Sequence, residues 1–113
     1  MARIVVGPLP ADPLAAAAAF HGQVLPRVIG ALTEARGTAL LVFDPADYSH
    51  RSWRLAAVQS LARRCAHRRI NAVEGTDEVA LAAAERYLDA AGGVTGQLLP
   101  LDSHGAGEVV SSA

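Results

Sequence analysis

Short apolar runs alternate with longer stretches of helical periodicity along the 113-residue chain. The runs carry almost no polar residues at alternate positions, which is typical of strands covered on both faces of a sheet. They lie at residues 3–9, 38–44, 69–73 and 96–102. The helical stretches between them lie at about 13–36, 49–67 and 77–91. This alternation predicts βαβ units with right-handed crossovers, and therefore a parallel sheet between layers of helices.

The first helical stretch carries signals for its start and for an irregularity inside it. Asp12 is placed to cap the helix, and Pro13 follows where a missing N–H costs nothing. Pro26 lies deeper and cannot bond to the carbonyl four residues earlier, so we expect a kink there. We expect residues 1–102 to form one domain and the Gly/Ser-rich segment 103–113 to be a flexible or partner-contacting tail.

The second helical stretch is apolar on two sides. One stripe has the spacing to pack on a sheet and consists of Leu55, Val58, Leu61, Ala62 and Cys65. The other lies roughly a third of the way round the helix axis and consists of Trp53, Ala57, Ser60 and Arg64. Because a surface helix in a small monomer needs only the first stripe, we expect the second to be buried in an oligomer interface. The alternative is a partly exposed Trp53 within a monomer.

Composition narrows the classes of function. The net charge is −1 and all ten basic residues are arginine, so the chain as a whole is not built around polyanions and contains no lysine. The single cysteine, Cys65, fits a reducing cytoplasm. Neither a signal peptide nor a membrane-length apolar segment is evident, so we expect a cytoplasmic protein without a membrane partner. The cysteine and the four histidines lack metal-ligand spacing, and we expect no metal.

Two groups of polar residues are candidates for chemistry. The first follows the second apolar run, where α/β sheets bind ligands, and consists of Asp44, Asp47, Tyr48 and His50. Carboxylates beside a histidine suit acid–base catalysis, but "DPAD" is also typical of a turn with an N-cap, which is the interpretation we favour. The second group is residues 49–73, with six arginines and no acid. The overall charge and the scarcity of aromatic residues for base stacking argue against nucleic-acid binding there.

Several segments, in order, carry a resemblance to a known family. "INAVEG" is followed, after a helix, by Thr95, Gly96, Gln97, Leu99 and Asp102 in a strand of the type T-G-Q-x-L-x-V-D. Upstream lie "LAAVQSLARRCA" and, before it, "HGQVLPRVIGAL" with "TALLVFD". Together they resemble the carboxyl-terminal half of the short-chain dehydrogenase/reductases. The resemblance implies a half Rossmann-like fold, a three-layer α/β sandwich with about four parallel strands and three main helices.

The resemblance also implies which functional groups are missing. The family's tyrosine proton donor and its lysine, four residues later, align with Arg51 and Leu55, and its serine falls near Asp44 and Pro45. A leucine can neither donate a hydrogen bond nor lower the pKa of a phenol. The family's glycine-rich dinucleotide loop has no counterpart in this sequence. We therefore expect no catalytic residue and no bound cofactor.

These features lead to three hypotheses. The first is a non-catalytic relative that acts as an oligomeric scaffold or regulatory subunit. In the family, the helices matching 13–36 and 49–67 form a four-helix bundle between subunits, which implies a homo-oligomer, or a heteromer with a full-length reductase, through the same surface. The second is an enzyme that completes its site with a partner chain or uses the Asp44–His50 cluster. The third is a basic nucleic-acid-binding module.

Overall fold

The computed structural model describes residues 1–34, 37–102 and 105–106, and its strands form one sheet. In spatial order they are β1 (Ala2–Val5), β2 (Ala39–Phe43), β3 (Ile70–Glu74), β4 (Leu98–Asp102) and β5 (Gly105–Ala106). The strands β1 to β4 are parallel, which confirms the sheet predicted from the apolar runs. β5 pairs antiparallel with β4, inside the segment that we expected to be a tail. The remainder of that segment, 103–104 and 107–113, lies outside the described residues.

The long helix expected first consists of three segments. It is built from α1 (Pro13–Ala19), the π-helical η1 (Phe20–Val24) and α2 (Leu25–Glu34). The N–H of Leu25 bonds to the carbonyl of Phe20, five residues earlier, and Pro26 follows directly. The irregularity expected at Pro26 therefore takes the form of a π-helical segment just before it. A proline cannot supply the N–H that the regular four-residue spacing requires.

The other helices begin near the predicted positions. The 3₁₀ turn η2 (Tyr48–His50) leads into α3 (Arg51–Arg64), and α4 (Glu78–Ala90) follows β3. Two aspartates cap helices as N-caps do, with Asp12 accepting from the N–H of Ala15 and Asp77 from that of Ala80, both at 2.9 Å. Within the described ranges, none of the helices combines the length and the apolar character needed to cross a bilayer.

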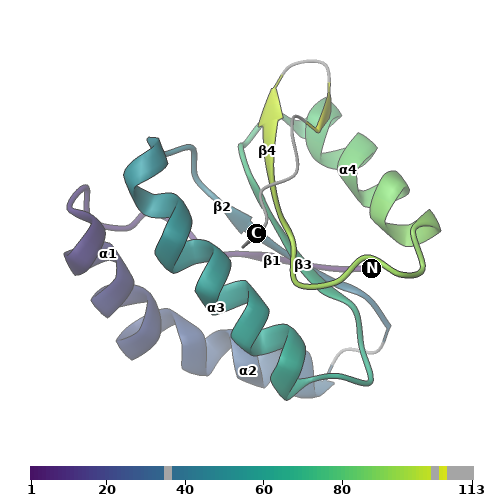
Figure 1. Cartoon of the computed structure of the whole chain (residues 1–113), viewed down its shortest axis with the longest axis horizontal. Coiled ribbons are helices and arrows are strands. Elements are labelled where there is room, and N and C mark those ends of the chain that lie inside the picture. Colours follow the sequence, from purple (N-terminus) through teal and green to yellow (C-terminus); the bar gives the residue numbers. More distant parts are fainter. Residues whose placement is uncertain (35–36, 103–104, 107–113) are drawn as a thin grey trace.

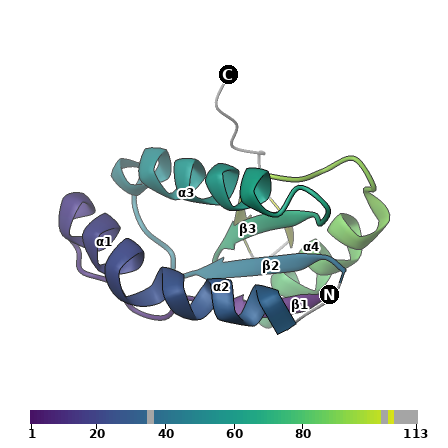
Figure 2. The same ribbon diagram turned by 90° about the horizontal axis from the view of Figure 1, so that it is seen from below.

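Helices cover both faces of the sheet, as Figures 1 and 2 show. On one face, α2 and α3 pack on strand residues such as Leu41, Phe43 and Ala72. On the other face, α4 packs on Leu40, Val42, Val73 and Leu99. Neighbouring residues of one strand therefore belong to different cores, which explains why the apolar runs lack polar alternation. The three-layer α/β sandwich is confirmed.

The third crossover differs from the first two. The connections from β1 to β2 and from β2 to β3 pass over the face covered by α2 and α3, whereas the connection to β4 passes over the opposite face through α4. The strand order nevertheless advances in one direction, so the third connection has the opposite hand from the first two. The expectation that every crossover is right-handed is therefore wrong. The apolar residues Leu81, Ala84 and Leu88 of α4 pack on the face that the other helices leave open.

Charged groups tie the first strand to the last helix. Arg3 of β1 donates to a carboxylate oxygen of Glu78 at 2.9 Å and to Glu85, both on α4. The hydrogen bonds to Glu78 and Glu85 raise the pKa of Arg3 above its usual value. The hydrogen bond from Arg3 to Glu78 in turn lowers the pKa of Glu78. The amino-terminal strand is thus fixed to the carboxyl-terminal helix across the sheet.

Candidate functional site

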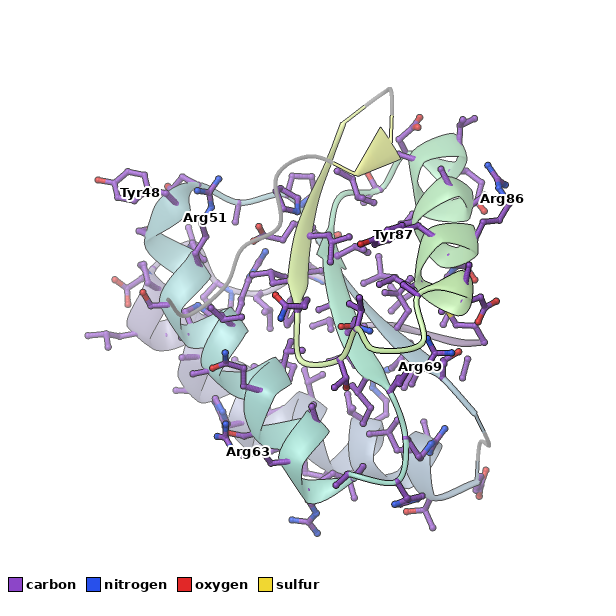
Figure 3. All side chains as sticks on the ribbon, turned by 45° about the vertical axis from the view of Figure 1, so that its right-hand side comes forward. Tyr48, Arg51, Arg63, Arg69, Arg86 and Tyr87 are labelled. Atoms are coloured by element: carbon purple, nitrogen blue, oxygen red, sulfur yellow. The ribbon has the colours of Figure 1, made fainter. Side chains whose placement is uncertain are left out.

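The positions of the family's catalytic residues lie at the carboxyl edge of the sheet, the edge at which the parallel strands end. Asp44 directly follows β2, and α3 starts from the same edge. Arg51, at the tyrosine position, is exposed in the first turn of α3, as Figure 3 shows. Leu55, at the lysine position, is 7% exposed and belongs to the core. The first turn of α3 therefore presents an arginine to solvent and a leucine to the core.

A buried ion pair lies next to these positions. Nη1 of Arg54 donates to Oε2 of Glu74 at 2.8 Å and to the carbonyl of Asp44 at 2.9 Å. The guanidinium carbon also lies 4.6 Å from the ring centroid of Phe43. The side chains of Arg54 and Glu74 are 4% and 6% exposed. The ends of β2 and β3 are thus joined to α3 by a charged pair that solvent hardly reaches.

Sequence reasoning missed this pair, although the sequence contains a signal for it. Arg54 shares a helix face with Val58 and Leu61, four and seven residues later, so helical spacing places it on the buried side. Glu74 is the last residue of an entirely buried strand. A charge on each of two buried elements that end at the same edge predicts an ion pair, because an unpaired buried charge is costly.

The residues of the Asp44–His50 cluster are only partly brought together. Asp44, Asp47 and His50 line a hollow of about 290 Å³ with Arg54 and the loop at residues 8–11. Tyr48 does not line it, because its side chain is 79% exposed and points away from the body of the molecule (Figure 3). Three of the four candidate residues thus share one site.

Both ring nitrogens of His50 are engaged in hydrogen bonds inside this hollow. His50 is 5% exposed, and its Nδ1 accepts a hydrogen bond from the indole Nε1–H of Trp53 at 3.2 Å. Its Nε2 lies 3.0 Å from the carbonyl of Ala11, which requires Nε2 to carry the proton. With both ring nitrogens engaged, His50 has no free lone pair to take a proton from a substrate. Its role here is to connect α3 with the loop before α1.

Asp47 acts as the N-cap that the turn interpretation predicted. Its Oδ1 accepts the N–H of Ser49 at 2.9 Å and also the hydroxyl of Ser49. The hydroxyl contact first, and then the amide contact, hold the pKa of Asp47 below the usual value of an aspartate. Asp47 is therefore a solvent-exposed carboxylate that is ionised at neutral pH.

A second candidate surface is the groove between α2 and α3. It has a volume of about 440 Å³. Its walls include the apolar side chains of Leu25, Ile29, Ala57 and Leu61, together with the exposed Ser60 and Arg64. Three residues of the predicted interface stripe, Ala57, Ser60 and Arg64, therefore line one groove. The neighbouring η1 contributes Phe20 and His21.

The fourth residue of that stripe, Trp53, does not line this groove. Its ring packs within the chain, 5.5 Å from the ring centroid of Phe20 and 5.8 Å from that of Phe43. Ala57 is likewise 6% exposed in the isolated chain. The segment η1 covers this part of α3, which helical periodicity in one helix could not reveal. Of the four residues, Ser60 and Arg64 are exposed, Trp53 is half-buried and Ala57 is buried.

The basic segment is largely used inside the fold. Arg68 is 9% exposed, and its guanidinium donates to the carbonyls of Gly37, at 3.0 Å, and of Leu32. Arg69 donates to the carbonyls of Leu88 and Ala91, each at 2.7 Å. These arginines satisfy carbonyls at the ends of α2 and α4, as cations at helix C-termini do. With Arg54 in an ion pair and Arg63 donating to the hydroxyl of Ser60 at 3.3 Å, four of the six arginines in this segment bond to the protein itself.

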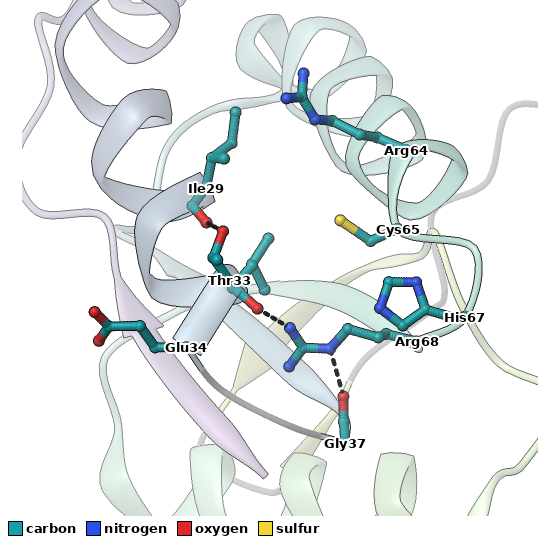
Figure 4. A pocket seen from close by; sticks show the side chains of 9 residues that line it. Ile29, Thr33, Glu34, Gly37, Arg64, Cys65, His67 and Arg68 are labelled. Carbon is teal, nitrogen blue, oxygen red and sulfur yellow. Dashed lines mark hydrogen bonds between the residues drawn. The ribbon is translucent and has the colours of Figure 1, made fainter.

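A larger cavity, of about 570 Å³, lies beside Arg68 where α2 and α3 end (Figure 4). Its walls include Thr33 and Glu34 of α2, and Arg64, Cys65 and His67 of the α3 end. Cys65, the last residue of the stripe expected to pack on the sheet, is half-buried and packs against the core. Among the residues with described positions, no group of histidine, cysteine and acidic side chains is arranged to hold a metal ion.

Two of the motifs that carry the family resemblance, N-A-V and T-G-Q, meet at the amino edge of the sheet, the edge at which the parallel strands begin. Asn71 of β3 is 2% exposed; its Nδ2 donates to the carbonyl of Val94, and its Oδ1 accepts the N–H of Gln97, both at 3.0 Å. The Thr95 hydroxyl accepts the N–H of Ile70 at 3.0 Å.

Between these residues, Gly96 adopts a φ of 73°, a conformation that favours glycine, and its N–H bonds to the carbonyl of Ile70 at 2.7 Å. The N-A-V and T-G-Q motifs therefore hold β3 and β4 in register.

The comparisons with known proteins agree with this geometry. A family model described as SDR-like, short chain dehydrogenase-like protein, matches residues 4–101. Neither the curated proteins nor the solved structures give a match to the chain. The matched range runs from β1 to β4 and includes α1 to α4. The chain belongs to the SDR-like family of short-chain-dehydrogenase-like proteins.

Proposed function

We propose that this chain is a non-catalytic SDR-like subunit that assembles with a second copy of itself and acts as a scaffold or regulatory subunit. The buried pair of Arg54 and Glu74 at the carboxyl edge carries the non-catalytic part of this proposal. The groove between α2 and α3 supports the assembly part.

The chemistry of the carboxyl edge favours structure over catalysis. Reduction of a carbonyl in this family's manner needs a proton donor and a neighbouring cation on the first turns of α3. Arg51 cannot act as an acid at neutral pH, because a guanidinium stays protonated, and Leu55 is buried and apolar. Arg54 is engaged by Glu74 and by a backbone carbonyl, and His50 has both ring nitrogens bonded. The side chains of Arg54, Glu74 and His50 near this edge are therefore already hydrogen-bonded within the chain.

The groove supports association because it combines apolar walls with a few exposed polar groups. Leu25 and Ile29 of α2 are partly exposed along it, and Leu61 of α3 lies between the two helices. Burial of such side chains against another molecule yields about 25 cal/mol per Å² of apolar area. Both of these helices form the subunit contact that the family resemblance implies. A second copy of the chain is the occupant that we propose.

The first test measures the mass of the purified chain by light scattering after size exclusion. We expect a dimer or a larger even-numbered assembly for the wild type. Ser60→Arg should shift the chain toward the monomer, because it places a long charged side chain at the groove without disturbing a buried residue. Ala90→Arg is the matched control, since Ala90 is exposed on α4, on the opposite face of the sheet. A wild type that stays monomeric at all concentrations measured contradicts the proposal.

The second test addresses catalysis by titration with NADH and NADPH. We expect no saturable change in nicotinamide fluorescence, because the side chains at the family's catalytic positions are Arg51 and Leu55. Saturable binding that is lost in Asp44→Asn would instead favour an active site in the hollow near His50. A full-length reductase of the family serves as the positive control for the assay.

A further inference from the structure

Two arginines are buried in the described part of the chain, and they differ in what balances their charge. Arg54 is 3% exposed and has the carboxylate of Glu74 at 2.8 Å. Arg68 is 9% exposed, and its partners within the described residues are the neutral carbonyls of Gly37 and Leu32. A carbonyl at a helix end carries only a partial negative charge, whereas a buried cation is costly without a full counter-charge. Arg68 therefore lacks what Glu74 supplies to Arg54.

One nitrogen of Arg68 is also left without a hydrogen bond. Its Nε donates to Gly37 at 3.0 Å and its Nη1 to Leu32, but Nη2 is buried and has no partner among the residues with described positions. Capping of α2 accounts for the first two nitrogens and not for Nη2. A guanidinium offers its donors in a planar fork, which suits the paired oxygens of a carboxylate. A carboxylate beside Arg68 would supply both the missing acceptor and the missing charge.

The cavity of about 570 Å³ at the ends of α2 and α3 is lined by Arg68 and by two further basic side chains, Arg64 and His67. Figure 4 shows the side chain of Arg68 crossing this space toward the end of α2. Arg64 is exposed and makes no hydrogen bond or ion pair within the described part of the chain. Glu34 also lines the cavity, but its carboxylate points away from the basic groups (Figure 4). The cavity is therefore predominantly basic, although the net charge of the chain is −1.

The size and the other walls of the cavity suit a small molecule. Its volume falls within the range of about 300–1,000 Å³ that is typical of ligand sites. Ile29 and Leu32 of α2 add apolar surface beside the basic groups. Because α2 and α3 end just before β2 and β3 begin, the cavity lies at the amino edge of the sheet, the edge opposite the hollow near His50.

We propose that this cavity binds a small organic acid. Its carboxylate is held by Arg64 and His67 and balances the charge of Arg68, while its apolar part lies against Ile29 and Leu32. A singly charged carboxylate suits the site better than a doubly charged phosphate, since α2 and α3 both present their negative ends there. The site goes beyond the proposed function and does not depend on assembly, because His67 and Arg68 line the cavity and not the groove between α2 and α3.

Cys65 provides a reporter within the cavity. It is the single cysteine of the chain, and its half-buried sulfur points into the space between α3 and α2 (Figure 4). Iodoacetate and iodoacetamide both form an S–C bond with it and release iodide, and the thiol proton passes to solvent. The two reagents differ in that the first carries a carboxylate and the second a neutral amide. Whole-chain mass spectrometry therefore measures reaction at one position with either reagent.

The test compares the two alkylation rates of the full chain at one pH. We expect the rate with iodoacetate to saturate as its concentration rises, because the anion binds before it reacts, and the rate with iodoacetamide to rise linearly. The iodoacetate-to-iodoacetamide ratio, divided by the same ratio for N-acetylcysteine, should exceed about three. Sodium butanoate should slow the reaction with iodoacetamide by occupying the cavity, whereas butanamide at the same concentration should not.

Variants locate the effect on the basic side chains. Arg64→Gln and His67→Gln should each lower the normalised ratio toward one, and Arg86→Gln is the matched control because Arg86 is exposed on α4, on the opposite face of the sheet. Light scattering checks the mass of Arg64→Gln, since Arg64 also lines the groove. Arg68→Met tests the buried charge and is read together with thermal unfolding, because it also leaves two carbonyls unbonded.

The outcomes separate this site from the proposed function. Saturation by iodoacetate, protection by butanoate and loss of both in the Arg64 and His67 variants support the site. A ratio near one overturns it, and so does a raised ratio without saturation, which would reflect attraction without binding. A thiol that reacts with neither reagent also overturns it, since the site requires a cavity that small molecules enter. Stronger protection by inorganic phosphate than by butanoate overturns the assignment to a carboxylate. A monomeric wild type contradicts the proposed function and leaves the site in place.

Discussion

The two edges of the sheet differ in how their residues are used. At the amino edge, neutral groups link β3 to β4, with Asn71 bridging the two strands and Gly96 supplying a conformation that favours glycine. At the carboxyl edge, the contacts are charged, and the ion pair of Arg54 and Glu74 lies beside the positions where the family has its chemistry. The N-A-V and T-G-Q motifs, which hold strands together, are thus present in this chain. The family's tyrosine and lysine positions, in contrast, align with Arg51 and Leu55. The family match covers both edges, because it runs over residues 4–101.

The largest effect is expected at the carboxyl edge. Glu74→Leu should lower the free energy of unfolding by about 3–5 kcal/mol, because it leaves the guanidinium of Arg54 buried without its counter-charge. The measurement is urea unfolding, with the midpoint and the slope both recorded so that a change in two-state behaviour is visible.

The double variant Arg54→Met/Glu74→Leu sharpens this test. It should recover most of the loss, since the pair need not be more stabilising than an apolar pair of similar volume. Within the described residues, the buried Nε of Arg54 also has no hydrogen-bond partner, so its removal relieves a further cost. A double variant as unstable as Glu74→Leu would show that the charges themselves stabilise this edge.

A smaller effect is expected at the amino edge. Asn71→Ala should lower the free energy of unfolding by about 2 kcal/mol, because it removes a donor and an acceptor and leaves their partly buried backbone partners without a bond. Thr38→Val is the control at the same edge, since the Thr38 hydroxyl bonds to Asp89 in an exposed contact of 3.0 Å. It should change stability by less than about 0.5 kcal/mol. If both variants lost the same free energy of unfolding, the hydrogen bonds of Asn71 would contribute no more to stability than the exposed contact of Thr38.

The sequence was sufficient for the features that depend on local pattern. Uninterrupted apolar runs indicated strands buried on both faces, Asp12 marked the start of the first helix, and Pro26 marked the irregular segment. The caps work because an aspartate side chain satisfies an N–H only three residues away, a contact that needs no tertiary information.

The features that depend on tertiary contacts were harder to predict. The hand of the last crossover depends on which face of the sheet α4 packs against. The burial of Trp53 depends on the packing of Phe20, in η1, against its ring. The spacing in α3 grouped Ala57, Ser60 and Arg64 correctly along one groove, but it could not show that Trp53 packs within the chain. The role of Arg54 required both its helix face and the burial of Glu74 to be considered together.

The link between Arg3 and α4 has a consequence for the order of folding. The contact from Arg3 to Glu85 spans 82 positions, so it closes a very long loop. Each doubling of loop length adds about 0.6 kcal/mol to the entropic cost of closure. The strands β2 and β3 can meet through a much shorter connection, whereas β1 gains its ionic tether only when the last helix has docked. During synthesis on the ribosome the strand with Arg3 is made before the helix with Glu85, so this contact forms only after that helix has been made.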